Sequence, residues 1–200
     1  PSYDTIRFDR NSRGRKLWER ERRVVDRFLS TLRPGSTVLD VPSGMGRFTD
    51  LIDRYGHRAV SIDLLFEHVH YIANRQNGIS TSALQADIGR LPLADNSIDA
   101  ALCIRLLHHL TPAQITTALA ELRRVTCSAL FTFYSRRTFK FIKKRFRGRP
   151  LNGRYYTPAT IEQLCLGAGW SDRRALTSNP LHNLHFMAVR RAESSMDRVA

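Results

Sequence analysis

Long apolar runs, cysteines and acidic residues are all scarce in this sequence. No apolar run approaches the length of about 18 residues that spans a bilayer, and the arginine-rich N-terminus lacks the hydrophobic core of a signal peptide. We therefore expect a cytoplasmic protein. The three cysteines, Cys103, Cys127 and Cys165, lie far apart among apolar neighbours. This placement argues against disulfides and redox chemistry and predicts buried, reduced thiols.

The scarcity of acidic residues gives the chain a strong positive charge. Asp and Glu number 18 while Lys and Arg number 32, so the formal net charge is +14. Such a charge favours an anionic partner, although it also keeps a protein soluble without one. No acidic residue occurs between Glu121 and Glu162, so that stretch is the main candidate for contact with an anion.

Apolar patterns alternate between strands and helices along the chain. We expect strands at 38–41, 59–63, 83–87, 98–104, 129–134, 173–177 and 184–190, and helices at 17–32, 48–56, 67–74, 115–125 and 157–168. This alternation predicts an α/β protein with a mostly parallel sheet flanked by helices. We expect one domain over 1–192, with a helical cap at 1–33, a basic insertion or lid at 135–156 and a flexible tail at 193–200.

The most informative motif follows the first expected strand. Asp40 ends the strand, and Gly44 and Gly46 form a tight turn before a helical pattern resumes. Glycines allow positive φ angles and a close approach of the backbone to a ligand, and the N–H groups at the start of the next helix are available donors. The turn lacks the Lys of a P-loop and the third glycine of a dinucleotide-binding turn. The motif resembles the first motif of class I S-adenosylmethionine (SAM) dependent methyltransferases, with Pro42 in the place of the first glycine.

Carboxylates also end the next two expected strands. Asp63 follows an apolar strand, where its two oxygens suit the vicinal diol of a ribose. Asp87 ends the third strand and could accept a hydrogen bond from an exocyclic amine, while Leu64 and Ile88 offer apolar flanks to a ring. An Asp at a strand end is equally often part of an Asx turn, so the order of these strand ends carries the argument.

The resemblance to class I methyltransferases implies a Rossmann-like fold whose last strand is antiparallel. It implies SAM as the cofactor and S-adenosylhomocysteine (SAH) as its product. Asp63 would hold the ribose, Asp87 the adenine amine, and Asp40 the turn or the amino group. The full set of cofactor-binding residues that the resemblance implies is Asp40, Pro42, Gly44, Gly46, Asp63, Leu64, Asp87, Ile88 and Arg105.

The segment from Arg136 to Arg149 distinguishes this chain. On a helix, Phe139, Ile142 and Phe146 share one face, which makes a basic amphipathic helix, although Phe141 falls on the polar side. We favour contact with an anionic membrane that carries a lipid-linked acceptor; nucleic acid is a weaker alternative, and a solvated lid is the third. The candidate anion-binding residues are Arg136, Arg137, Lys140, Lys143, Lys144 and Arg145.

The sequence predicts O-methylation of a small or lipid-linked anionic acceptor. It predicts a cytoplasmic chain, which contact between the basic segment and a membrane would place peripherally on the inner membrane face. His108 follows the fourth strand and is the candidate general base, with packing as the alternative. An RNA methyltransferase and a non-catalytic SAM-binding regulatory domain stay open as other functions. Four further histidines match no metal-site motif: His68, His70, His182 and His185. We therefore expect no metal.

Overall fold

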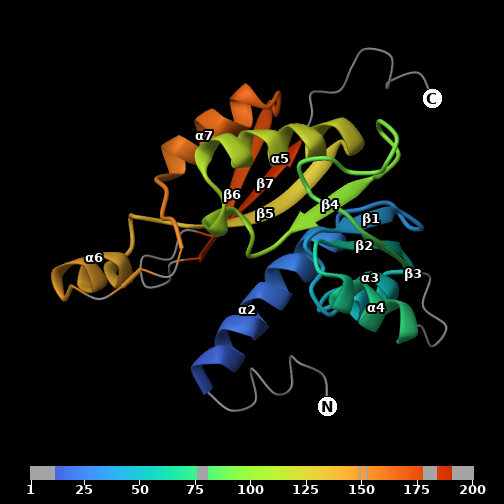
Figure 1. Ribbon diagram of the computed structural model, residues 1–200, viewed down its shortest axis with the longest axis horizontal. Coiled ribbons are helices and arrows are strands. Elements are labelled where there is room, and N and C mark those ends of the chain that lie inside the picture. The colour runs from blue at the N-terminus through green and yellow to red at the C-terminus, as the bar shows by residue number, and fades with distance from the viewer. Residues whose placement is uncertain (1–11, 76–80, 149, 152, 178–183, 191–200) are drawn as a thin grey trace. The chain divides into compact units, whose positions relative to one another are not determined.

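The computed structural model describes residues 12–75, 81–148, 150–151, 153–177 and 184–190 (Figure 1). The side chains of residues 12–14, 140, 144 and 174–177 are not described. The chain forms two compact units, residues 1–87 and 88–200. The expectation of one domain over 1–192 stays a prediction, and the expected tail at 193–200 lies outside the described residues, as does His182.

The described part of the first unit contains three parallel strands and three helices. Its elements are α2 (Ser12–Leu29), β1 (Thr37–Asp40), α3 (Thr49–Arg54), β2 (Arg58–Asp63), α4 (Phe66–Asn74) and β3 (Thr81–Gln85). Strand β2 pairs in parallel with both β1 and β3. The apolar side chains of β1 and Ile62 of β2 are buried, as expected for parallel strands that helices cover. Helix α4 packs on β2 and β3.

Helix α2 is fastened to the first unit at its C-terminal end. The Tyr55 hydroxyl donates to Asp26 Oδ1 at 3.1 Å, and His57 Nε2 lies 3.3 Å from the Leu29 carbonyl. The helix ends at Leu29, three residues before the expected end at Leu32. The amides of Thr31 and Leu32 bond to the carbonyls three residues before them, so the helix ends in tighter turns.

The described part of the second unit contains four strands, of which one is antiparallel to its neighbours. Its elements are β4 (Ala100–Cys103), η1 (Leu107–His109), α5 (Pro112–Val125), β5 (Ser128–Tyr134), α6 (Phe139–Phe146), α7 (Pro158–Gly167), β6 (Asp172–Thr177) and β7 (Leu184–Arg190). The strand order within this unit is β4-β5-β7-β6. Strands β4 and β5 are parallel, and β7 is antiparallel to both β5 and β6. The expected antiparallel last strand is therefore confirmed.

Local sequence explains where the helices of the second unit begin. Thr111 caps α5 in a capping box with Gln114, and Thr157 caps α7, each followed by a proline at the first helical position. Helices α5 and α7 pack together (Figure 1). The buried Trp170, just after α7, donates from Nε1 to the Leu119 carbonyl of α5 at 3.1 Å. None of the described helices is long and apolar enough to cross a membrane.

The cysteine prediction is wrong at one position. Cys103 and Cys165 are buried as expected, and burial raises the pKa of Cys165 to about 12. Cys127 is exposed. Its neighbours Thr126 and Ser128 are buried at the entry to β5, and because side chains alternate between two sides in extended backbone, Cys127 points outward.

Candidate functional site

The glycine turn connects β1 to α3 in the first unit. Gly44 and Gly46 have φ angles of +55° and +73°, which favour glycine. A Cβ on Gly46 would lie 2.9 Å from Thr49 Oγ1 and 3.3 Å from Ile72 Cγ1, so Gly46 is required by packing of the turn. A Cβ on Gly44 would meet no atom within 4 Å. The backbone at Gly44 therefore faces open space that a ligand could fill.

Asp40 lies buried at the carboxyl end of β1, and its side chain accepts no hydrogen bond from the described residues. The residue is 1% exposed, and neither carboxylate oxygen has a hydrogen-bond partner among the described residues. Burial raises the pKa of Asp40 to about 7, Arg47 opposes this shift and Asp63 adds to it. A buried carboxyl without donors next to a glycine turn is suited to a cationic ligand group.

Asp63 ends β2, as the sequence predicts, but its carboxylate already has partners. Oδ2 accepts a hydrogen bond from the Gly44 amide at 2.8 Å. Oδ1 accepts from the Leu65 amide at 3.0 Å and lies 3.1 Å from His68 Nδ1. The carboxylate thus joins the glycine turn to the start of α4. Since a carboxylate can accept about four hydrogen bonds, a ligand hydroxyl would share it with these groups.

An apolar surface and a second carboxylate follow Asp63. Leu64, Leu65 and Phe66 are 62%, 52% and 59% exposed. The Ala86 amide donates to the Asp63 carbonyl at 3.1 Å, so the exit of β3 meets the end of β2. Asp87 lies in this exit, exposed and two residues beyond β3 rather than at its end. The first unit therefore brings the acidic strand ends and an apolar surface together.

An ion pair that the sequence analysis missed fastens the glycine turn to α2. Arg47 Nη2 lies 2.7 Å from Glu21 Oε2, and Glu21 is fully buried. The Arg47 guanidinium also lies 4.5 Å from the Trp18 ring centroid. Glu21 falls four residues from both Leu17 and Val25, on the apolar stripe of the helix. An acidic residue on such a stripe is the signal that could have predicted this buried pair.

The remaining predicted cofactor residues lie elsewhere. Pro42 follows Val41 in the turn after β1. Ile88 begins the second unit and is half-buried. Arg105 follows β4 with a φ angle of +64°, and its amide donates to Thr132 Oγ1 at 2.7 Å. A non-glycine residue in this conformation is strained, and such strain gathers at functional sites.

His108 is packed rather than poised for proton transfer. It is buried in η1, and its ring stacks on Tyr134 with centroids 3.9 Å apart. Burial lowers the pKa of His108 to about 3, with further contributions from His109 and Arg105. A neutral imidazole with so low a pKa is a weak base near neutral pH. The geometry therefore favours the packing alternative over the base.

The basic segment forms the expected helix, α6, capped by Thr138. Phe139, Ile142 and Phe146 are 62%, 46% and 87% exposed. Phe141, expected on the polar side, instead attaches the helix, because its ring packs on Tyr155 with centroids 4.9 Å apart. The cations then lie in three groups. Arg136 and Arg145 line a cavity, Arg137 and Lys143 are exposed, and the side chains of Lys140 and Lys144 are outside the described set.

Comparison with known proteins identifies the fold. Magnesium protoporphyrin IX methyltransferase from Synechocystis PCC 6803, solved with bound SAH, is similar at a TM-score of 0.71 and 16% identity, over 96% of this chain and 100% of that chain. This similarity shows the fold, which is the Rossmann-like class I methyltransferase fold. It agrees with the strand arrangement found in each unit.

Sequence comparison matches part of the chain to a methyltransferase domain. A family model described as a methyltransferase domain matches residues 38–128. The malonyl-acyl-carrier protein O-methyltransferase of Hamiltonella defensa subsp. Acyrthosiphon pisum (strain 5AT) is 29% identical over 136 residues, 65% of this chain and 51% of that protein. An uncharacterized 37.1 kDa protein in transposon TN4556 of Streptomyces fradiae is 37% identical over 99 residues, 46% of this chain and 28% of that protein. This chain therefore spans about half of the first relative's length and less of the second's. Residues 38–128 therefore match a methyltransferase domain, and the chain shares the fold of a class I methyltransferase.

Proposed function

We propose that this chain transfers a methyl group from SAM to an oxygen of a small or lipid-linked anionic acceptor. The observation that carries the proposal is the cradle formed by Asp40, Gly44 and Asp63, with open space at Gly44 and an unsatisfied buried carboxyl at Asp40. When bound, SAM supplies a methyl group on a positively charged sulfur. The chain's residues need only hold that group and the acceptor in line, because alignment alone contributes a large part of such a rate.

The residues of the first unit fit the parts of SAM by their chemistry. Asp40 would pair with the ammonium of the methionine part, and Gly44 would leave room for its chain. The Asp63 carboxylate, which accepts from the Gly44 amide, would also hold the ribose hydroxyls. The exposed Leu64 would cover the adenine ring, and Asp87 would accept from its amine.

A pair of alanine substitutions tests this assignment. Gly44→Ala places a methyl group in the space assigned to SAM, whereas Gly56→Ala places one in open space after α3. The two glycines have φ angles of +55° and +68°, so both substitutions carry a similar backbone cost. We expect calorimetry to show that Gly44→Ala lowers SAH affinity about 10-fold or more, which corresponds to about 1.4 kcal/mol or more of binding free energy. Gly56→Ala should leave SAH affinity unchanged. Equal affinity in the two variants would contradict the assignment.

The O-methyltransferase relative supports transfer to oxygen. The net charge of +14 supports an anionic acceptor. The experiment is incubation with radiolabelled SAM and separate pools of metabolites, lipids, protein and RNA. We expect the label to appear in the metabolite pool or in the lipid pool. Label in RNA would favour an RNA methyltransferase, and SAH binding without transfer to any pool would favour a regulatory SAM-binding domain.

We also propose that α6 rests on an anionic membrane that carries the acceptor, at the inner face of the cytoplasmic membrane. The exposed side chains of Phe139, Ile142 and Phe146 each gain about 1.5–3 kcal/mol when fully buried. Each nearby Lys or Arg adds about 1 kcal/mol at an anionic surface. Phe141 holds the helix to the second unit on its other side.

Vesicle flotation tests the membrane proposal. Ile142→Ser removes an apolar side chain that is 46% exposed on α6, and Leu166→Ser removes one that is 53% exposed on α7. We expect vesicles containing phosphatidylglycerol to bind the native chain and Leu166→Ser at low salt, and to bind Ile142→Ser more weakly. Equal binding of both variants would remove the membrane proposal.

A further inference from the structure

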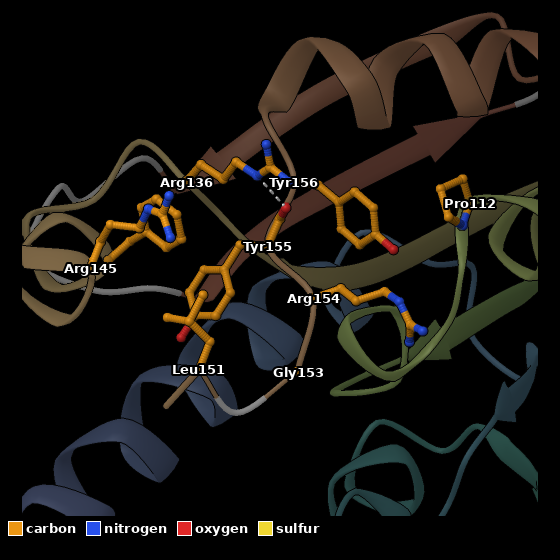
Figure 2. A pocket seen from close by; sticks show the side chains of 9 residues that line it. Pro112, Arg136, Arg145, Leu151, Gly153, Arg154, Tyr155 and Tyr156 are labelled. Atoms are coloured by element: carbon orange, nitrogen blue, oxygen red, sulfur yellow. Dashed lines mark hydrogen bonds between the residues drawn. The ribbon is translucent and has the colours of Figure 1, made fainter. Parts of the chain in front are cut away.

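A cavity of about 610 Å³ in the second unit gathers positive charge beside aromatic rings. Three guanidinium groups reach it from separate segments: Arg136 follows β5, Arg145 lies on α6, and Arg154 precedes α7 (Figure 2). We call this cavity the arginine pocket. Its lining residues are Pro112, Arg136, Phe141, Arg145, Leu151, Gly153, Arg154, Tyr155 and Tyr156.

The aromatic wall of the arginine pocket is held by hydrogen bonds. Tyr155 and Tyr156 are buried. The Arg136 amide donates to the Tyr156 carbonyl at 2.9 Å, and the Tyr156 amide donates to the Tyr134 carbonyl at 2.8 Å. The Tyr156 hydroxyl donates to the Leu110 carbonyl at 2.6 Å. The wall is therefore fixed to β5 and to the segment between η1 and α5, both in the same unit.

The arginines of the pocket keep donors for a ligand. Arg136 donates from Nε to the Tyr155 carbonyl at 2.7 Å (Figure 2), and Arg154 donates from Nη1 to the His109 carbonyl at 2.8 Å. A guanidinium has five N–H donors, so each of these bonds orients the group and uses only one of them. Both bonds end on neutral carbonyls, and among the described residues no carboxylate forms an ion pair with these two arginines.

No internal counterion is available from the surrounding sequence. Residues 122–161 contain no Asp or Glu, and this stretch supplies every lining residue except Pro112. Three like charges around one cavity repel each other, and an anion that accepts from two or three guanidinium groups converts this repulsion into attraction. Arginine is suited to carboxylate and phosphate because its planar fork donates two parallel hydrogen bonds.

We infer that the arginine pocket binds the phosphate or carboxylate of the methyl acceptor, with an apolar or aromatic part of the same molecule against Tyr155 and Phe141. The inference rests on the proposed function and specifies its acceptor. The bound anion anchors the acceptor and is not the oxygen that receives the methyl group, because pairing with guanidinium lowers an oxygen's nucleophilicity. Arg136, Arg145 and Arg154 are thus specificity residues.

Calorimetry with phenyl phosphate tests the inference. Arg145→Gln removes a charge from the pocket, and Arg147→Gln removes the same charge one residue after α6, outside the lining. We expect phenyl phosphate to bind the native chain, Arg145→Gln to weaken binding about 10-fold or more, and Arg147→Gln to change it less than twofold. Inorganic phosphate should bind more weakly than phenyl phosphate, because it lacks the ring that packs on Tyr155. Equal losses in the two variants, or no binding at millimolar concentration, would overturn the inference.

Further arms identify the source of the anion and separate the inference from the cofactor assignment. Dihexanoyl phosphatidate carries a phosphate monoester on a glycerol with two short acyl chains. If it binds more tightly than phenyl phosphate, the anion is a lipid headgroup. Binding only to anionic vesicles, with no soluble anion bound, would overturn the pocket in favour of a charged surface. SAH affinity should stay unchanged in both glutamine variants. Loss of SAH binding by Gly44→Ala is independent of these arms, so either idea can fail alone.

Discussion

The buried pair of Glu21 and Arg47 allows a direct test of how α2 supports the glycine turn. Glu21 is fully buried, the Arg47 side chain is 15% exposed, and their nearest atoms are 2.7 Å apart. Arg47→Met keeps much of the side-chain volume but removes the Arg47 charge from beside the buried Glu21 carboxylate. Breaking a buried pair in this way costs about 3–5 kcal/mol. The lost contact with the Trp18 ring adds about 1 kcal/mol.

A double-mutant cycle gives the test its control. Glu21→Leu with Arg47→Met replaces both charges by apolar groups, and such replacements are often neutral or stabilising by about 1–4 kcal/mol. We expect urea unfolding, followed by circular dichroism, to show a large loss of stability in Arg47→Met and recovery in the double variant. The tryptophan fluorescence of Trp18, which packs on Phe48, should follow the same order.

The same variants should report on the turn itself. Arg47 lies one residue after Gly46, so loss of the pair loosens the turn, and SAH affinity should fall in Arg47→Met even where the chain is folded. Two results would refute this reasoning. One is a stability loss below about 1 kcal/mol in Arg47→Met, which is the scale of an exposed pair. The other is strict additivity in the cycle, which would mean that the two residues are not coupled.

Three further substitutions test particular residues. Gly153→Ala should lower stability and phenyl phosphate affinity without changing SAH affinity, because its Cβ would lie 2.7 Å from the His108 carbonyl oxygen at a φ angle of +95°. Asp40 has a raised pKa of about 7 when folded, so the folded state holds the proton, and the stability of the native chain relative to Asp40→Asn should fall as pH rises from about 4 to 7. His108 has a lowered pKa of about 3, so its contribution is present above pH 6.5 and lost as pH falls, and His108→Phe should remove that acid sensitivity while keeping the ring on Tyr134. Urea unfolding between pH 4 and 7 measures the stability of the native chain relative to each of the last two variants. The two stability differences should change with pH in opposite directions.

Most of the secondary structure could be predicted because each element carries a local signal. Thr157 and Pro158 mark the start of α7, and the glycine turn marks the junction of β1 and α3. Helix α6 follows from the spacing of its apolar residues. Such signals depend on residues within one or two turns of each other, and these are visible in a sequence.

Contacts between distant residues could not be predicted in the same way. The helical spacing puts Phe141 on the polar side of its helix, yet its ring packs on Tyr155, fourteen residues later in the chain. Arg154 joins Arg136 in one cavity only because the segment before α7 bonds to the end of β5. The burial that lowers the pKa of His108 also comes from tertiary packing. The residue types are visible in the sequence, and only the fold shows what surrounds them.

The two roles of Asp63 decide how the cofactor proposal can be tested. Its carboxylate accepts from the Gly44 amide and the Leu65 amide before any ligand is bound. Replacing Asp63 would therefore loosen the turn and remove a ligand contact together, and a loss of SAH affinity could not be divided between them. Asp63→Asn is equally unsuitable, because the amide nitrogen would face one of these donors. Gly44→Ala leaves every one of these hydrogen bonds in place, so it isolates occupation of the cradle by the ligand.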